Sequence, residues 1–137
     1  MRIFLDANIL FSAAKSDGAV RRLLDLMTEA GHELVADGYV IEEARRNLAL
    51  KTPRGLAALR MVLRRIEISP IHSNADLAES ELLALPEKDR PILAAAIRAG
   101  CYALVTGDRT HFGGLYGKTV RGVAVHSPRS LAEKLDL

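Results

Sequence analysis

Short strand-like segments alternate with longer helical segments along the chain, and this alternation is the strongest constraint on its fold. Apolar residues recur at helical spacing between the strand-like segments, for example at Val20, Leu23 and Met27. Strands that are separated by helices form a parallel sheet with helices on both faces. The sequence therefore predicts an α/β fold. Its strand-like segments are residues 1–5, 33–36, 66–68, 102–105 and 120–125.

The length and composition are those of one globular domain, which we expect to span residues 1–137 without repeats or linkers. The longest unbroken apolar run, residues 92–97, is too short to cross a bilayer. The N-terminus lacks the charged-then-apolar layout of a signal peptide, so we expect a cytoplasmic protein without a membrane partner. Cys101 is the only cysteine, which excludes an internal disulfide and a thiolate cluster for structural zinc.

Charge is distributed unevenly, although the net charge is only +2. Residues 44–66 contain seven basic side chains and no acidic one, whereas residues 75–89 contain five acidic side chains and one lysine. A basic stretch of this kind can attract a polyanion such as RNA. It is equally compatible with the solvated face of a pair of helices.

Three aspartates stand where ligands usually bind in such folds. Asp6 and Asp108 follow strand-like segments, and the carboxyl ends of parallel strands share the edge of the sheet that binds ligands. Asp89 falls in the first turn of a predicted helix, where the helix dipole stabilises a carboxylate. Each also has a purely structural interpretation, because aspartate commonly caps helices and occupies turns.

Two adjacent glutamates precede the basic stretch. At roughly 100° of rotation per residue, Glu43 lies nearer than Glu42 to the apolar face of its predicted helix. Glu42 points more nearly to solvent, where it can pair with Arg46 at i+4. Glu43 is therefore the better candidate for the sheet edge, with Glu42 as the alternative. A surface pair between Glu43 and Arg46 at i+3 would remove Glu43 from the site.

These motifs resemble those of the PIN-domain family of metal-dependent ribonucleases, particularly its small members similar to VapC toxins. Each motif is weak alone, but their order and their strand and helix positions are specific. The resemblance covers essentially the whole chain and implies a three-layer α/β/α sandwich with a central, mostly parallel sheet of about five strands. The matching segments are residues 5–10, 43–48, 88–96, 105–112 and 123–128.

The resemblance implies an acidic quartet of Asp6, Glu43, Asp89 and Asp108 as catalytic residues and metal ligands. Clustered carboxylates repel one another, and a hard divalent cation relieves this cost. Mg²⁺ or Mn²⁺ suits such oxygen ligands and can activate water against an RNA phosphodiester.

Polar and basic residues around the quartet suggest supporting roles. We expect Asn8 and Thr106 to orient the acidic groups. Arg45 and Arg46 would bind the RNA backbone without regard to sequence. Arg109 and His111 follow Asp108 and would contact phosphate.

The partners implied by the resemblance are an RNA substrate, an antitoxin protein and a second copy of the chain in a homodimer. A competing hypothesis is a catalytically idle PIN-like module that binds RNA or protein. Retention of the acidic set argues against it, because an uncompensated acidic cluster lowers stability. An aspartyl-phosphatase mechanism is disfavoured because Asn8 occupies the position of the second acid, and no Gly-rich phosphate-binding loop is present.

Overall fold

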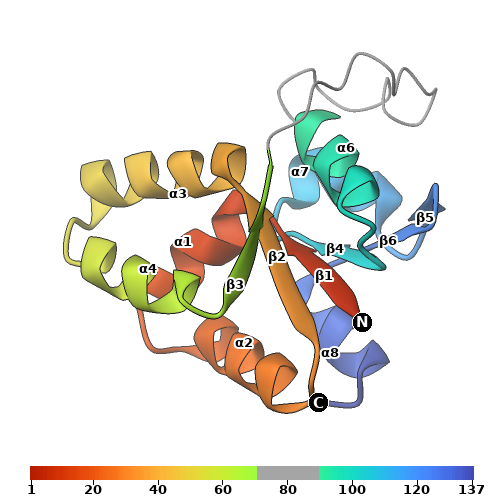
Figure 1. Cartoon of the computed structure of the whole chain (residues 1–137), viewed down its shortest axis with the longest axis horizontal. Helices are drawn as coiled ribbons and strands as arrows, with labels where there is room; N and C mark the ends of the chain where they lie inside the picture. Colours follow the sequence, from red (N-terminus) through yellow and green to blue (C-terminus); the bar gives the residue numbers. More distant parts are fainter. Residues whose placement is uncertain (71–89) are drawn as a thin grey trace.

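The computed structural model describes residues 1–70 and 90–137, which form a six-stranded sheet flanked by helices (Figure 1). The strand order is β3-β2-β1-β4-β6-β5. Every neighbouring pair is parallel except β5 and β6, which are antiparallel. The predicted mostly parallel sheet is therefore confirmed. The strands are β1 (Arg2–Leu5), β2 (Glu33–Asp37), β3 (Ile66–Ser69), β4 (Ala103–Val105), β5 (Thr119–Val120) and β6 (Val123–His126).

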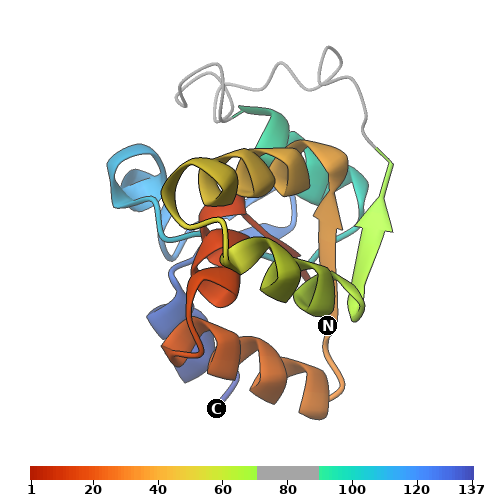
Figure 2. The same ribbon diagram turned by 90° about the vertical axis from the view of Figure 1, so that its left-hand side faces the viewer.

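Helices cover both faces of this sheet, which confirms the predicted three layers. Four helices gather on one face, while α6 (Arg90–Arg98) lies on the opposite face (Figures 1 and 2). The helix α8 (Pro128–Lys134) follows β6 and contacts α2. A short helix, α7 (Arg109–Phe112), and one 3₁₀ turn, η2 (Gly113–Leu115), connect β4 to β5. The four helices on the first face are α1 (Ala7–Lys15), α2 (Ala19–Glu29), α3 (Gly38–Lys51) and α4 (Gly55–Leu63).

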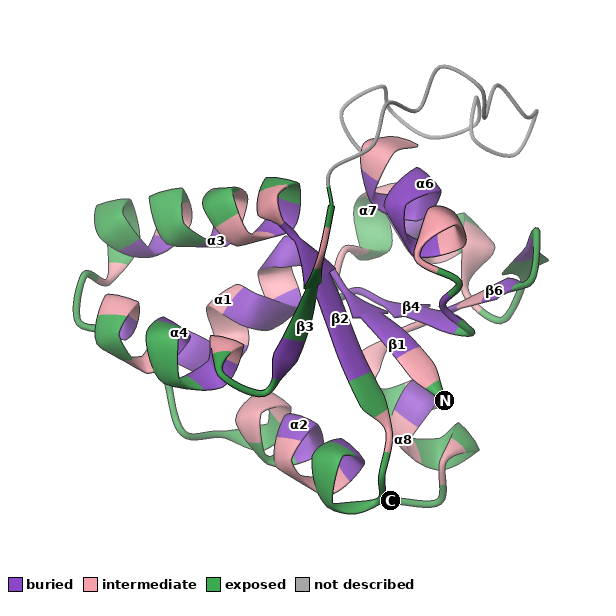
Figure 3. Ribbon diagram, in the orientation of Figure 1, coloured by how far each residue is buried: buried purple, intermediate pink, exposed green. Residues whose placement is uncertain are grey.

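The two central strands form the middle of the core. Ile3, Phe4 and Leu5 of β1 are fully buried, as are all three residues of β4 (Figure 3). Such continuous apolar runs are expected where helices cover both faces of a parallel strand. At the sheet edge, β3 keeps Glu67 and Ile68 exposed. The polarity of each strand thus follows its position in the sheet.

The sheet has one strand more than the five predicted, because the strand expected at residues 120–125 is a hairpin. Arg121 and Gly122 both have positive φ, at 48° and 87°. Two positive φ values in a two-residue loop allow β5 and β6 to pair tightly as an antiparallel hairpin. Thr119 pairs with Ala124, and Val120 pairs with Val123. Gly122 is a sequence signal for a break in this segment, but the left-handed conformation of Arg121 has no signal in the local sequence.

Several helix ends follow the sequence signals. Gly31, with φ of 86°, follows α2 after one residue, and Pro128 begins α8. The spacing of Leu77, Ala78 and Leu82 also predicts a helix, but this segment lies outside the described residues. Within residues 1–70 and 90–137, none of the helices is both long enough and apolar enough to span a bilayer.

Asp37 is the last residue of β2 and caps α3. Its replacement tests how much this cap contributes to stability. The residue is 3% exposed, and its side chain accepts a hydrogen bond from the Val40 backbone N–H at 3.1 Å. Replacing Asp37 by Ala removes this acceptor and is expected to lower the free energy of unfolding by about 1 kcal/mol. Asp37→Asn retains a capping oxygen and should lose less. Urea unfolding of both variants measures the difference, and wild-type stability in Asp37→Ala would show that the cap contributes nothing.

Candidate active site

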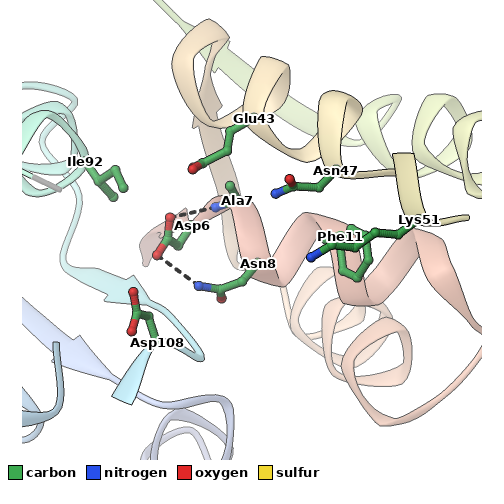
Figure 4. Close-up of a pocket in the computed structure, with 9 residues that line it drawn as sticks. All are labelled: Asp6, Ala7, Asn8, Phe11, Glu43, Asn47, Lys51, Ile92 and Asp108. Carbon is green, nitrogen blue, oxygen red and sulfur yellow. Dashed lines mark hydrogen bonds between the residues drawn. The ribbon is translucent and has the colours of Figure 1, made fainter. Parts of the chain in front are cut away.

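A pocket of about 190 Å³ opens where β1 and β4 end, at the carboxyl edge of the sheet (Figure 4). Its lining combines three carboxylates, two amides and one ammonium group with three apolar side chains. The polar groups come from α1, α3 and the residues that follow the two central strands. The lining residues are Asp6, Glu43, Asp108, Asn8, Asn47, Lys51, Ala7, Phe11 and Ile92.

Asp6 is the most deeply placed carboxylate of the pocket, with only 3% of the residue exposed. It follows β1 directly, and its backbone N–H still pairs with the Val105 carbonyl of β4 at 3.1 Å. Oδ1 accepts a hydrogen bond from the Ala7 backbone N–H at 2.7 Å, which caps α1. Oδ2 accepts one from the Thr106 hydroxyl at 2.7 Å and one from the Asn8 amide at 3.2 Å. These bonds hold the carboxylate in one orientation.

Asn8 and Thr106 connect the two central strand ends. The Asn8 amide nitrogen donates to Thr106 Oγ1 at 3.3 Å, and its oxygen accepts from the Gly107 backbone N–H at 2.8 Å. Thr106 Oγ1 also accepts from the Asp108 backbone N–H at 3.1 Å. One hydroxyl group therefore links Asp6 to the backbone of Asp108. A Cβ at Gly107 would lie 3.3 Å from the Asn8 side-chain oxygen, so the close approach favours glycine there.

Asp108 directly precedes the short helix α7 and caps it, because its Oδ1 accepts a hydrogen bond from the His111 backbone N–H at 3.0 Å. The His111 Nδ1 atom lies 2.9 Å from Asp108 Oδ2, a distance that gives an ion pair when the imidazole is protonated. Phe112, the last residue of α7, is fully buried. This ring anchors the segment that carries Asp108 to the core.

Glu43 and Glu42 point in different directions from α3. Glu43 lines the pocket, and Figure 4 shows its carboxylate directed toward Asp6. Glu42 forms an ion pair with Arg45 at i+3, not with Arg46 at i+4 as the sequence suggested. The surface pair considered for Glu43 and Arg46 is not among the ion pairs of the described chain. Of the two glutamates, only Glu43 contributes to the pocket lining.

The amino-acid sequence of this chain matches the model of a known domain family. Residues 2–110 match the model described as PIN domain. The chain belongs to the PIN-domain family. Among curated protein sequences, none matches this chain at a significant level.

Solved structures with this fold include VapBC proteins bound to DNA and a VapC toxin. VapBC2 from Rickettsia felis, bound to a promoter DNA fragment, matches with a TM-score of 0.70 at 17% identity, covering 93% of this chain and 98% of that chain. DNA-bound VapBC from Salmonella typhimurium matches with a TM-score of 0.67 at 16% identity and the same coverage. VapC20 from Mycobacterium tuberculosis, a toxin that cleaves the sarcin-ricin loop, matches with a TM-score of 0.59 at 11% identity, covering 82% and 94%. At these identities the likeness establishes the fold.

The donor atoms of this PIN domain suit a hard divalent cation. Carboxylate and amide oxygens are the ligands that Mg²⁺ and Mn²⁺ prefer. Within the part of the chain that the structure describes, no three Asp, Glu, His or Cys side chains lie close enough together to ligate one ion directly. Mg²⁺ usually keeps several waters and binds only one or two carboxylates directly, so the spaced carboxylates of Asp6, Glu43 and Asp108 fit a partly hydrated ion. Asp89, the remaining predicted ligand, lies outside the described residues.

The predicted RNA-binding residues are not gathered in the pocket. Arg45 lines a separate, largely apolar groove between α3 and α4. Arg46 is exposed on α3, and Arg109 is exposed at the start of α7. His111 lies beside Asp108, as its sequence position suggested.

Sequence reasoning missed four residues at or beside the pocket. Asn47 and Lys51 line it at i+4 and i+8 from Glu43, a spacing that places all three on one face of α3. Phe11 lines it from α1. Tyr116 donates its hydroxyl to the Thr106 carbonyl at 2.8 Å, and burial, with a smaller effect of the Asp108 charge, raises its pKa. Tyr116 therefore remains a neutral donor at physiological pH.

Proposed function

We propose that this PIN domain, taken as one domain over residues 1–137, is a Mg²⁺- or Mn²⁺-dependent endoribonuclease of cytoplasmic RNA. The observation that carries the proposal is the convergence of Asp6, Glu43 and Asp108 in one pocket, although they are far apart in the sequence. Such a gathering of negative charge is costly without a cation, and a nucleic-acid phosphate cannot approach it unaided.

The residues that we propose to hold the ion, directly or through its bound waters, are Asp6, Glu43, Asp89 and Asp108. Ile92, from the first turn of α6, lines the pocket, and Asp89 directly precedes α6 in the sequence. This proximity along the chain supports Asp89 as the fourth ligand. When bound, the ion would polarise a phosphoryl oxygen and activate water for in-line attack.

The chain's own residues would orient the reaction. Thr106 and Asn8 fix Asp6 through their hydrogen bonds to Oδ2, so this carboxylate needs little rearrangement to bind a cation. The Thr106 hydroxyl also holds the backbone of Asp108, which couples the positions of the two acids. His111 pairs with Asp108, and we propose that it donates a proton to a leaving oxygen or contacts phosphate.

We further propose that the protein is the toxin of a toxin–antitoxin pair. The similar structures from Rickettsia felis and Salmonella typhimurium are VapBC complexes, which supports an antitoxin partner for this chain. The resemblance of the motifs to VapC toxins also implies a homodimer. Both partners can be tested by co-expression of the chain with its candidate antitoxin, followed by a mass measurement in solution.

The nuclease function is tested with purified protein and a panel of transfer, ribosomal and messenger RNAs. We expect cleavage in Mn²⁺ and none in EDTA. Mn²⁺ should also raise the melting temperature, since saturation to about 100 times Kd stabilises a protein by about 2.7 kcal/mol. An idle RNA-binding module would bind RNA without cleaving it.

The adjacent glutamates provide a matched pair for the same assay. Glu43→Gln removes one charge from the pocket and should reduce kcat/KM by about 100-fold, the upper range for groups that tune a metal site. Glu42→Gln removes the same charge one residue away, where the side chain pairs with Arg45, and should retain activity. Equal activities of the two variants would exclude Glu43 from the mechanism, and metal-independent cleavage would overturn the proposed function.

A further inference from the structure

The charge of the groups that line the pocket changes from negative to positive along α3. Glu43, Asn47 and Lys51 line it from one face of the helix, so that a carboxylate, an amide and an ammonium group follow one another at single-turn spacing. Eight residues of helix rise about 12 Å. This distance is spanned by a few stacked nucleotides at roughly 3.4 Å each. The acidic end and the basic end therefore lie within reach of one short stretch of RNA.

The basic end is built around the ring of Phe11. The Lys51 Nζ atom lies 5.7 Å from the ring centroid, and the Lys15 Nζ atom lies 5.9 Å from it. Both distances are within the range of a cation–π interaction. Figure 4 shows the Lys51 side chain lying across Phe11 with its ammonium group directed toward Asn8. The ring thus holds two positive charges beside the pocket.

Within the described residues, neither Lys15 nor Lys51 forms an ion pair with a carboxylate. Two like charges at one ring repel each other, and an anion bound there would relieve the repulsion. By contrast, Arg45 already pairs with Glu42 and lines a different groove. Lys15 and Lys51 are therefore better placed than Arg45 to receive a phosphate near the acidic pocket.

We propose that Phe11, Lys15 and Lys51 form a subsite that binds a backbone phosphate of single-stranded RNA, a few nucleotides away from the phosphate that is cleaved. The proposal rests on the nuclease function proposed above. It adds a contact between the protein and its RNA substrate outside the acidic end of the pocket. Lysine binds phosphate as a compact point charge, and positive grooves with an aromatic side chain are typical of single-strand binding. The subsite would hold the strand while the carboxylates act on a phosphate a few nucleotides away.

The test compares Lys51→Ala, Lys15→Ala and Lys51→Arg with Lys134→Ala, which removes an exposed lysine from the distant helix α8. Binding of a fluorescein-labelled single-stranded RNA is measured by anisotropy in EDTA at several salt concentrations. Cleavage of the same RNA is measured in Mn²⁺. Melting temperatures show whether each variant is folded.

We expect Lys51→Ala and Lys15→Ala each to weaken binding by about fivefold, the upper range for an exposed charge pair. Each should reduce the slope of log K against log salt concentration by about 0.7, the value for one lost contact with a single strand. KM should rise with kcat unchanged. Lys51→Arg keeps the positive charge and should show the wild-type slope. Lys134→Ala should leave the affinity, the slope and KM at the wild-type values.

The outcomes separate the two proposals. If the wild type cleaves RNA and Lys51→Ala and Lys15→Ala match Lys134→Ala in slope and KM, the subsite is overturned and the nuclease remains. If no RNA is cleaved but the slope depends on Lys51 and Lys15, the nuclease fails while the phosphate contact stands. If cleavage and the dependence on Lys51 and Lys15 are both absent, both proposals are overturned.

Discussion

Replacing Asp6 by Asn is expected to reduce kcat/KM for RNA cleavage by about 10³-fold, equivalent to about 4 kcal/mol of transition-state stabilisation. Asp6 is the most buried carboxylate of the pocket and is held by Thr106 and Asn8. The amide of Asn keeps the shape of the side chain but removes the negative charge that would attract a cation. Asn also caps helices well, so α1 should keep its start.

The measurement pairs cleavage rates with melting temperatures in the presence and absence of Mn²⁺. We expect Asp6→Asn to remain folded without metal and to lose the stabilisation by Mn²⁺. Asp37→Asn is the matched control, because Asp37 is equally buried, ends the neighbouring strand β2 and caps α3, but does not line the pocket. Full activity and full stabilisation by Mn²⁺ in Asp6→Asn would remove Asp6 from the mechanism.

Replacing Phe112 by Ala is expected to lower the free energy of unfolding by about 3–5 kcal/mol, the usual cost of deleting a buried aromatic ring. Phe112 is fully buried, and its backbone N–H pairs with the Asp108 carbonyl at 3.0 Å. Deleting the ring would leave a cavity and remove the packing that holds α7, the helix that Asp108 caps, against the core. Since domains are stable by only about 5–15 kcal/mol, this loss is a large fraction of the total.

Urea unfolding measures the stability of this variant, and cleavage at a temperature where it remains folded measures the effect on the site. Phe112→Leu keeps most of the apolar volume and should lose less stability. Phe11→Ala removes the same ring from a half-buried position and should also cost less. A loss below about 1 kcal/mol in Phe112→Ala would show that the ring is not an anchor.

The alternation of strands and helices was predicted from the sequence because it depends on residues that are close along the chain. Apolar runs such as the one in β1 can be buried only between two layers of helices, and the periodicity of α2 marks its buried face. The same local reasoning favoured Glu43 over Glu42, because one residue of helix turns the side chain by about 100°. It also placed Asp6 and Asp108 at one edge of the sheet.

Only the tertiary structure decided which groups meet at that edge. The sheet order makes β1 and β4 neighbours, and this pairing brings Asn8 to Gly107 and Asp6 to Thr106 across about a hundred residues of chain. The packing of α1 against α3 likewise sets Lys51 beside Phe11. No local pattern encodes such contacts, because they depend on the docking of whole elements whose partners are distant in sequence. The candidate acidic residues could be identified from the sequence, whereas the pocket that they share is formed only by packing between elements that are distant in the sequence.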